Sequence, residues 1–321
     1  MNRRQFLEAV AVGLITAPGL GAAPLAKLPQ RRLGRTGLKV PILGFGSGSR
    51  FLMYKDEDKA IAALNQAIDL GITYLDTAHA YGDGRSEELI GRVMATRRKE
   101  VTLATKIPAR TADQARREIE LSLKRLHTDH LEVLHIHVLK NLQDLAAIEA
   151  PDGVLKALYE AREQKVTRAI GITCHADPVA LRTALERHDF DCTQMALNAG
   201  LARMADAPGG MKATLMGAAS FERLALPVAV RKHMGVIAMK VFGQEQLIGA
   251  APVEKLLNYA LSLPVSLASV GMPRLDHIER NAALARAFSP MSARERRRLA
   301  DSIESGRKLA MRHFFSVHQD A

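Results

Sequence analysis

Eight strand-like segments, each followed by a segment of helical periodicity, predict an α/β protein. Three observations favour a single (β/α)8 TIM barrel. The alternation runs from about residue 41 to residue 286, no linker or low-complexity segment interrupts it after residue 30, and the length of 321 residues exceeds the roughly 250 that such a barrel needs. We expect residues 27–321 to form this one domain, with an N-terminal hairpin and an extra C-terminal helix.

The predicted strands are short apolar runs bounded by turn residues. They lie at 41–46, 72–75, 101–105, 131–137, 168–172, 192–197, 235–240 and 266–270. The predicted helices lie at 57–70, 86–95, 111–126, 152–165, 177–187, 219–233, 252–262 and 274–286. Ser86 is expected to cap the second helix, and Asp177 with Pro178 gives the fifth helix a favourable start.

Three segments lie outside this alternation. Residues 31–40 predict a hairpin, because Gly34 and Gly37 flank a turn. Residues 198–218 are rich in Met, Ala and Gly and predict a long, adaptable loop above the barrel. The Arg-rich segment at about 291–311 predicts the last helix, packed outside the barrel.

The N-terminus has the features of a targeting segment. Residues 2–7, NRRQFL, resemble a twin-arginine export motif. The apolar stretch 9–20 is too short and too interrupted for a membrane span, and small residues follow it. We therefore predict that residues 1–26 are a twin-arginine-type signal peptide, read by the twin-arginine export machinery, and that the protein is periplasmic. A cytoplasmic protein is the alternative.

Composition indicates a protein that acts on small molecules. Hydrophobic residues make up 47% of the chain and charged residues 25%, as in ordinary globular proteins. The net charge is +11, but the basic residues are scattered and aromatics reach only 4%, too few for nucleic-acid stacking platforms. Cys174 and Cys192 form no zinc or CxxC pattern, and a disulfide between them stays open. We expect a monomer.

The stretch 71–94, GITYLDTAHAYGDGRSEELIGRVM, carries the first candidates for chemistry. Asp76 ends a predicted strand, Tyr81 lies in the Gly-rich loop after it, and Lys106 ends the next strand. The carboxyl ends of parallel barrel strands share one face, so these side chains are expected to meet. Tyrosine has a reference pKa of about 10, and a nearby cation lowers it. The pattern therefore predicts a tyrosine acid beside a lysine.

Seven motifs in order now make the chain similar to the aldo-keto reductase family. They are LDTAHAYGDGRSEELIG, LATK, DHLEVLHIH, IGITCH, DCTQMALN, GVIAMKVFG and SVGMPRLDHIERN. The resemblance implies an NADP-dependent oxidoreductase that reduces an aldehyde or ketone, a small-molecule carbonyl substrate, to an alcohol. It also implies a catalytic tetrad of Asp76, Tyr81, Lys106 and His137. In it Tyr81 donates the proton, Lys106 favours its phenolate, Asp76 fixes Lys106, and His137 orients the substrate.

The same resemblance implies a cofactor site, with NADP favoured over NAD. Its nicotinamide end would comprise Gly46, Ser47, Thr173, Cys174, His175, Gln194 and Met239, and Lys240 would reach the diphosphate. Its adenosine end would comprise Gly271, Met272, Arg274, His277 and Asn281. Arg274 opens a predicted helix and is the candidate for the 2′-phosphate, by charge and helix dipole. Four positions depart from the family: Cys174 replaces an asparagine, Met239 a stacking aromatic, Gly271 a lysine and Arg280 a glutamate.

Two other functions fit parts of the sequence. A cofactor-binding barrel without turnover would serve as a redox-sensing or regulatory subunit. A metal-dependent hydrolase barrel would use His135 and His137, which alternate on one strand and point the same way. A lysine and a tyrosine beside a metal would be poorly motivated, so we expect no metal. His135 is then a core histidine one layer below the site.

Overall fold

The computed structural model of this chain describes residues 26–207, 210–215, 219–243 and 247–303. At its centre, eight strands close into a barrel in the order β3-β4-β5-β6-β7-β8-β11-β12, and each neighbouring pair is parallel. The strands are β3 Leu43–Gly46, β4 Tyr74–Asp76, β5 Thr102–Ile107, β6 Leu131–Ile136, β7 Thr167–Cys174, β8 Cys192–Ala196, β11 Gly235–Met239 and β12 Leu267–Val270. The predicted barrel is confirmed.

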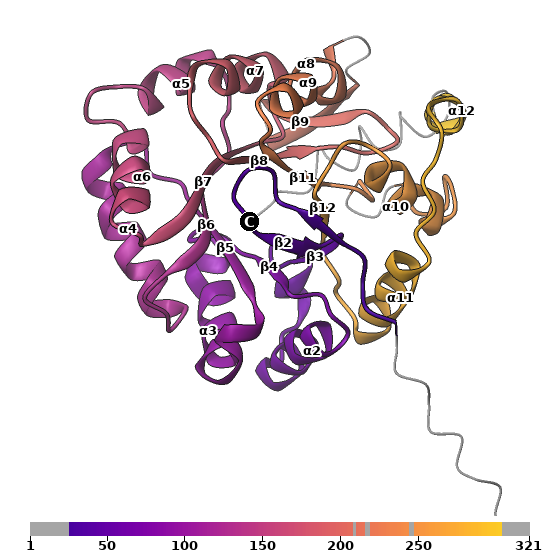
Figure 1. Ribbon diagram of the computed structural model, residues 1–321, viewed down its shortest axis with the longest axis horizontal. Coiled ribbons are helices and arrows are strands. Elements are labelled where there is room, and N and C mark those ends of the chain that lie inside the picture. Colours follow the sequence, from indigo (N-terminus) through magenta and orange to yellow (C-terminus); the bar gives the residue numbers. More distant parts are fainter. Residues whose placement is uncertain (1–25, 208–209, 216–218, 244–246, 304–321) are drawn as a thin grey trace, which may run out of the picture.

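Helices surround the barrel (Figure 1). They are α2 Glu57–Asp69, α3 Arg85–Arg97, α4 Ala112–Arg125, α5 Leu142–Ile148, α6 Val154–Glu163, α7 Pro178–Arg187, α8 Phe221–Leu224, α9 Leu226–Arg231, α10 Val253–Leu261, α11 Leu275–Arg286 and α12 Ala293–Ile303. The start of α7 is confirmed, because the Asp177 carboxylate accepts from the backbone N–H groups of Val179 and Ala180. The last predicted helix is confirmed to residue 303, and 304–311 lie outside the described residues.

Side chains on each barrel strand alternate between the interior and the surrounding helices. The lower interior is apolar and contains Leu33, Val40, Tyr74, Ala104, Val133, Ala169, Cys192, Ile237 and Leu267. A Cβ on Gly44 would lie 3.0 Å from the Tyr74 ring and 2.7 Å from Leu267, so this glycine makes room for the ring. The next inward positions along these strands are polar, and they build the candidate site.

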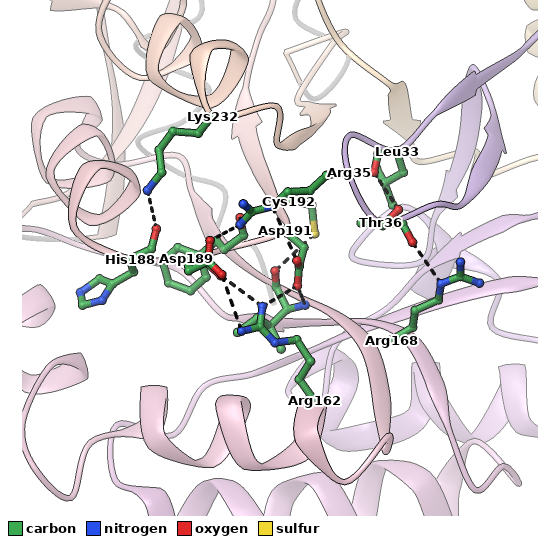
Figure 2. Close-up of polar contacts among 12 residues, drawn as sticks. Leu33, Arg35, Thr36, Arg162, Arg168, His188, Asp189, Asp191, Cys192 and Lys232 are labelled. Atoms are coloured by element: carbon green, nitrogen blue, oxygen red, sulfur yellow. Dashed lines mark hydrogen bonds and ion pairs between the residues drawn. The ribbon is translucent and has the colours of Figure 1, made fainter.

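A two-stranded hairpin closes the amino-terminal end of the barrel. It consists of β1 Gln30–Arg32 and β2 Lys39–Pro41, as predicted. Arg35 pairs with Asp189 and donates to the carbonyl of Phe190, and Arg168 donates to the carbonyl of Thr36 (Figure 2). These contacts hold the hairpin against the starts of β7 and β8, opposite the end where the strands carry their polar side chains.

Three local predictions were wrong, and one helix was missed. The predicted loop 198–218 contains an antiparallel pair, β9 Ala202–Ala207 and β10 Gly210–Leu215. The helix at 219–233 divides into α8 and α9, where Pro227 opens the second part. Helix α5 was not predicted. Ser86 does not cap α3, because its hydroxyl is buried and donates to the carbonyl of Ser47.

Two further expectations concern the covalent and membrane state. Cys174 and Cys192 are free and buried, so no disulfide joins them. Within the described ranges, no helix is both long and apolar enough to cross a bilayer. The predicted signal peptide falls almost wholly on residues 1–25, outside the part of the chain that the structure describes.

Candidate active site at the carboxyl end of the barrel

A buried ion pair lies at the centre of the site. Lys106 Nζ is 2.9 Å from Asp76 Oδ1, and these side chains are only 2% and 5% exposed. The ammonium also donates to the carbonyl oxygen of Thr77 at 2.6 Å. Burial lowers the pKa of Lys106, but its interactions with Asp76 and Tyr81 outweigh that effect, so the pKa lies above its ordinary value. Lys106 is therefore a cation inside the barrel.

Two further side chains fix the carboxylate of this pair. Asp76 Oδ2 accepts from Gln194 Nε2 at 2.8 Å and from Ser269 Oγ at 3.1 Å. Gln194 comes from β8, Ser269 from β12 and Lys106 from β5, so side chains from three strands hold the carboxylate of Asp76. Ser269 was missed by sequence reasoning. Its alternation with the inward-facing Leu267 would have placed it on the interior face.

The Tyr81 ring lies beside this ion pair. The Lys106 ammonium is 4.9 Å from the centre of the ring, and the ring of His137 meets it edge-on at 5.4 Å between centroids. A Cβ added at Gly48 would lie 3.4 Å from the Tyr81 ring, so the backbone after β3 packs against that ring. The structure thus brings all four residues of the predicted tetrad together.

The loop that carries Tyr81 is held from outside the barrel. Residues 82–84 all have positive φ. Gly82 and Gly84 adopt this conformation without strain, whereas Asp83 adopts it at a cost in free energy. Arg125 from α4 donates to the carbonyls of His79 and Asp83, at 3.3 and 3.2 Å. Its guanidinium also lies 3.5 Å from the fully buried carboxylate of Glu87. These contacts join both ends of the loop.

His137 follows the last residue of β6 and is a neutral imidazole. Burial lowers its pKa well below the ordinary value, and the nearby cation of Lys106 lowers it further. A neutral ring has one N–H to donate and one nitrogen that accepts. Because the two rings lie side by side, His137 and Tyr81 could both contact the same atom of a bound molecule.

His135 lies one layer deeper, as the sequence indicated for a core histidine. Its side chain is 0% exposed, and neither ring nitrogen has a hydrogen-bond partner in the structure. Burial, and then Lys106, lower its pKa to about 3. Among the described residues no group of three or more His, Cys, Asp or Glu side chains is placed to hold a metal. The geometry lends no support to the metal-hydrolase alternative.

Several predicted cofactor residues line the mouth of the barrel. A Cβ on Gly46 would lie 3.2 Å from Ser269 Oγ and 3.3 Å from the backbone nitrogen of Gly271, so a side chain here would crowd both neighbours. Ser47 is buried and its N–H donates to the carbonyl of Asp76 at 2.8 Å. Thr173 Oγ1 accepts from the N–H of Val138 at 2.8 Å, so its hydroxyl hydrogen is left to donate elsewhere.

The Cys174 side chain faces the surrounding helices, which corrects its assignment as a cofactor contact. Its thiol donates to the carbonyl of Leu139 at 3.0 Å, and it belongs to the core between barrel and helices. Thr173 and His175 flank it and therefore face the other way. His175 is buried, and its charge state influences His137. It remains a candidate at this position.

On β11, Met239 is the next inward position after the interior residue Ile237, and it is half-buried. Its thioether is thus placed at the mouth of the barrel. Lys240, directly after it, has φ +58°, a left-handed conformation that is uncommon for lysine. The chain turns sharply here, and the carbonyl of Lys240 accepts from the N–H of Gly243.

The predicted adenosine end lies at the start of α11. Arg274 precedes the helix, is 65% exposed, and pairs with Asp276 at 2.6 Å.

Asn281 is buried further along α11, and the N–H of His277 donates to the carbonyl of Arg274. The Met272 side chain is fully buried in the core, which leaves only its backbone for a ligand. Arg50, not predicted, packs its stem on Gly271, where a Cβ would lie at 2.7 Å.

Comparison with known proteins agrees with this geometry. Residues 42–209 match the profile described as the Aldo/keto reductase family. The aldo-keto reductase YhdN of Bacillus subtilis is 37% identical over 153 residues, covering 43% of this chain and 44% of that protein. The aldo-keto reductase yakc [NADP(+)] of Schizosaccharomyces pombe is 33% identical over 175 residues, or 49% of each. The chain spans about half the length of the curated relatives it matches.

Solved structures share the fold. The holo form of aldo-keto reductase AKR11C1 from Bacillus halodurans superposes with a TM-score of 0.69 at 22% identity, over 86% of this chain and 96% of that one. An aldo-keto reductase from Klebsiella pneumoniae in complex with NADPH gives 0.66 at 23%, over 86% and 95%. The profile match extends over half of the sequence. This chain therefore belongs to the aldo/keto reductase family.

Proposed function

We propose that this protein reduces an aldehyde or ketone to an alcohol with NADPH as hydride donor. One observation carries the proposal: the buried Asp76–Lys106 pair lies beside the Tyr81 ring, with the neutral His137 at its edge. A buried cation next to a phenol suits proton donation to a carbonyl oxygen.

The side chains divide the work as follows. The cofactor NADPH, when bound, would supply the hydride that the carbonyl carbon accepts. Tyr81 gives its phenolic proton to the carbonyl oxygen, and the Lys106 ammonium stabilises the phenolate that remains. Asp76 keeps Lys106 charged and fixed. His137 donates a hydrogen bond to the same oxygen and so orients the carbonyl carbon toward the hydride donor.

The cofactor contacts proposed at the mouth of the barrel rest on its backbone and polar groups. Gly48 brings the backbone against the Tyr81 ring, and Thr173 retains a hydroxyl hydrogen for a carboxamide oxygen. In our proposal Met239 lies against the nicotinamide face, a weaker contact than a stacked aromatic ring. Gln194 donates one amide hydrogen to Asp76, so its second N–H and its amide oxygen are left for the carboxamide.

NADP is proposed over NAD because Arg274 supplies a cation where the resemblance places the adenosine 2′-phosphate. Arg274 stands at the N-terminus of α11, where the helix dipole also favours an anion. His277 would help to hold that phosphate, and Asn281 would contact the adenine. Gly271 and the Met272 backbone would lie at the same adenosine end, and Lys240 would reach the diphosphate. The Schizosaccharomyces pombe relative is named for NADP(+), and the Klebsiella pneumoniae structure is a complex with NADPH.

Export by the twin-arginine machinery remains a second proposal, carried by residues 2–7, NRRQFL, before a short apolar run. That machinery translocates folded proteins, so a cofactor acquired in the cytoplasm would travel with the enzyme. We therefore propose a periplasmic location.

The test of the function is direct. Fluorescence titration should first show NADPH binding, and mixing the complex with a panel of aldehydes and ketones should then oxidise the cofactor. A protein that binds NADPH tightly but oxidises none in a single turnover would be the barrel without turnover, and the reductase proposal would be rejected.

A further inference from the structure

The geometry points to Arg110 as a positioning residue for His137. It acts by holding the next residue, Val138, in a left-handed backbone conformation that valine alone does not favour. This inference rests on the proposed function, in which His137 orients the substrate carbonyl. Neither the family motifs nor the charge pattern of the sequence singles out Arg110 or Val138.

Arg110 connects two loops at the carboxyl end of the barrel. It lies between β5 and α4, and Nη2 donates to the carbonyl oxygens of His137 and Val138 at 3.0 and 2.8 Å. Nη1 donates to the carbonyl of Pro108 in its own loop at 2.9 Å. One planar guanidinium thus fixes the two peptide groups that follow β6.

Helix α5 supplies the counter-charge. Asp144, in its first turn, accepts from Arg110 Nε at 2.6 Å and from Nη2 at 2.9 Å. The N–H of Lys140 donates to the same carboxylate at 3.0 Å, and Asn141 caps the helix by accepting from the Asp144 N–H. Arg110 is therefore held in a two-pronged pair and cannot swing away from the carbonyls.

Val138 has φ +52°, in the left-handed region. A β-branched side chain clashes with its own backbone there, so such residues are rare and persist only where their surroundings enforce them. On one side the N–H of Val138 donates to Thr173 Oγ1 at 2.8 Å. On the other side the carbonyl oxygen of Val138 accepts a hydrogen bond from Arg110. Without these restraints Val138 would relax to an extended conformation and rotate the end of β6 that carries His137.

Charge supports the same arrangement. The positive charge of Arg110 is one of the influences that keep the pKa of His137 low, after burial, Lys106 and His175. The titratable and charged groups around His137 are Lys106 from β5, Tyr81 after β4, His135 on β6, His175 after β7, and Arg110 itself. Asp144 pairs with Arg110, so its carboxylate partly offsets that charge.

The first two variants separate the hydrogen-bonding geometry of Arg110 from its charge. Arg110→Lys keeps the charge but loses the planar fork, and Arg110→Met loses both. We expect each to lower kcat/KM for carbonyl reduction by about tenfold to a hundredfold, with NADPH affinity unchanged, because a small displacement of an orienting group has such effects. Only Arg110→Met should also shift the titration of His137 to higher pH.

The decisive readout is rescue by Val138→Gly. Glycine adopts the left-handed conformation without strain, so the loop no longer depends on Arg110. The single variant Val138→Gly should have a kcat/KM close to that of the parent. Combined with Arg110→Lys, it should restore most of the kcat/KM that Arg110→Lys alone loses. A merely structural arginine would not be rescued in this way. The matched control is Arg116→Met, which breaks another two-pronged arginine–carboxylate pair, with Glu160, away from the site and should leave kcat/KM unchanged.

A second measurement does not need turnover. In the NADPH-free protein, nuclear Overhauser contacts between the rings of Tyr81 and His137 should weaken in Arg110→Lys and return in the double variant with Val138→Gly. Parent-like activity and ring contacts in both Arg110 variants, or lost contacts that Val138→Gly fails to restore, would overturn the inference. A parent protein that reduces no carbonyl, with the ring contacts behaving as expected, would overturn the proposed function instead. If Arg110→Met does not fold, the Arg110→Lys pair carries the same comparison.

Discussion

Replacing His135 with leucine tests how the interior of the barrel handles a buried imidazole. His135 is fully buried, and both of its ring nitrogens lack hydrogen-bond partners. Leaving a polar group buried without a partner costs about 1–3 kcal/mol. Leucine is similar in size and has no polar atom to satisfy. We therefore expect His135→Leu to be at least as stable as the parent near pH 7.

The larger effect is on the pH dependence of stability. The pKa of His135 is about 3 in the folded protein, against a reference of about 6.5 for unfolded histidine. Below about pH 6.5 the unfolded chain therefore binds a proton at this site that the folded chain refuses, and stability falls with falling pH. Between about pH 7 and pH 5 this single site costs the parent roughly 2 kcal/mol. The result depends little on the folded pKa, provided that it stays well below 5.

The assay is urea unfolding at these two pH values for the parent and for His135→Leu. On acidification from pH 7 to pH 5, the free energy of unfolding of the variant should fall by roughly 2 kcal/mol less than that of the parent, because the variant has no histidine at this position. Other buried histidines contribute equally to both proteins and cancel in the difference. An identical pH dependence would show that His135 takes up a proton in the folded state. A variant destabilised by several kcal/mol at neutral pH would show that the ring has a ligand or partner after all.

Three further predictions follow from the site and the N-terminus. Asp76→Asn leaves the Lys106 ammonium buried without its carboxylate, so calorimetry should show a melting temperature lower by roughly 5–8 °C, from about 3–5 kcal/mol. Adding Lys106→Met should recover part of that loss, whereas strictly additive losses would contradict a coupled pair. Arg274→Ala should weaken NADPH binding by about 1.5–3 kcal/mol and leave NADH binding nearly unchanged in fluorescence titrations; equal losses would place Arg274 away from the 2′-phosphate. Arg3→Lys with Arg4→Lys should retain the folded protein in the cytoplasm of its host, and unchanged fractionation would argue against twin-arginine export.

The barrel and the tetrad were predictable because both follow from regular rules. Strand and helix periodicities alternate eight times, and a parallel barrel brings all its strand ends to one face. Asp76, Lys106 and His137 each lie at or just after the end of a strand, so the topology alone places them together. Tyr81 lies in the loop after β4, where no strand register fixes a side chain, so the sequence placed it near Lys106 only because the carboxyl ends of the strands share one face.

Other features depend on contacts that periodicity does not encode. The pair β9–β10 forms in a segment rich in Met, Ala and Gly, which have low strand propensity, and backbone pairing alone defines it. The role inferred for Arg110 depends on a left-handed Val138 that no sequence rule anticipates. The orientation of Cys174, by contrast, was available from strand alternation. Thr173 and His175 share the inward face, so the residue between them had to face the helices.

The central claim is that Tyr81 donates the proton in a reduction driven by NADPH. The measurement that tests it most directly is a single-turnover experiment, in which NADPH complexes of the parent and of Tyr81→Phe are mixed with an aromatic aldehyde. Phenylalanine keeps the ring that contacts Lys106 and His137 but removes the acid. NADPH affinity should stay near that of the parent, while cofactor oxidation slows by about a hundredfold or more, as expected for the loss of a general acid. A Tyr81→Phe protein that oxidises NADPH as fast as the parent would contradict the claim, because another group would then be supplying the proton.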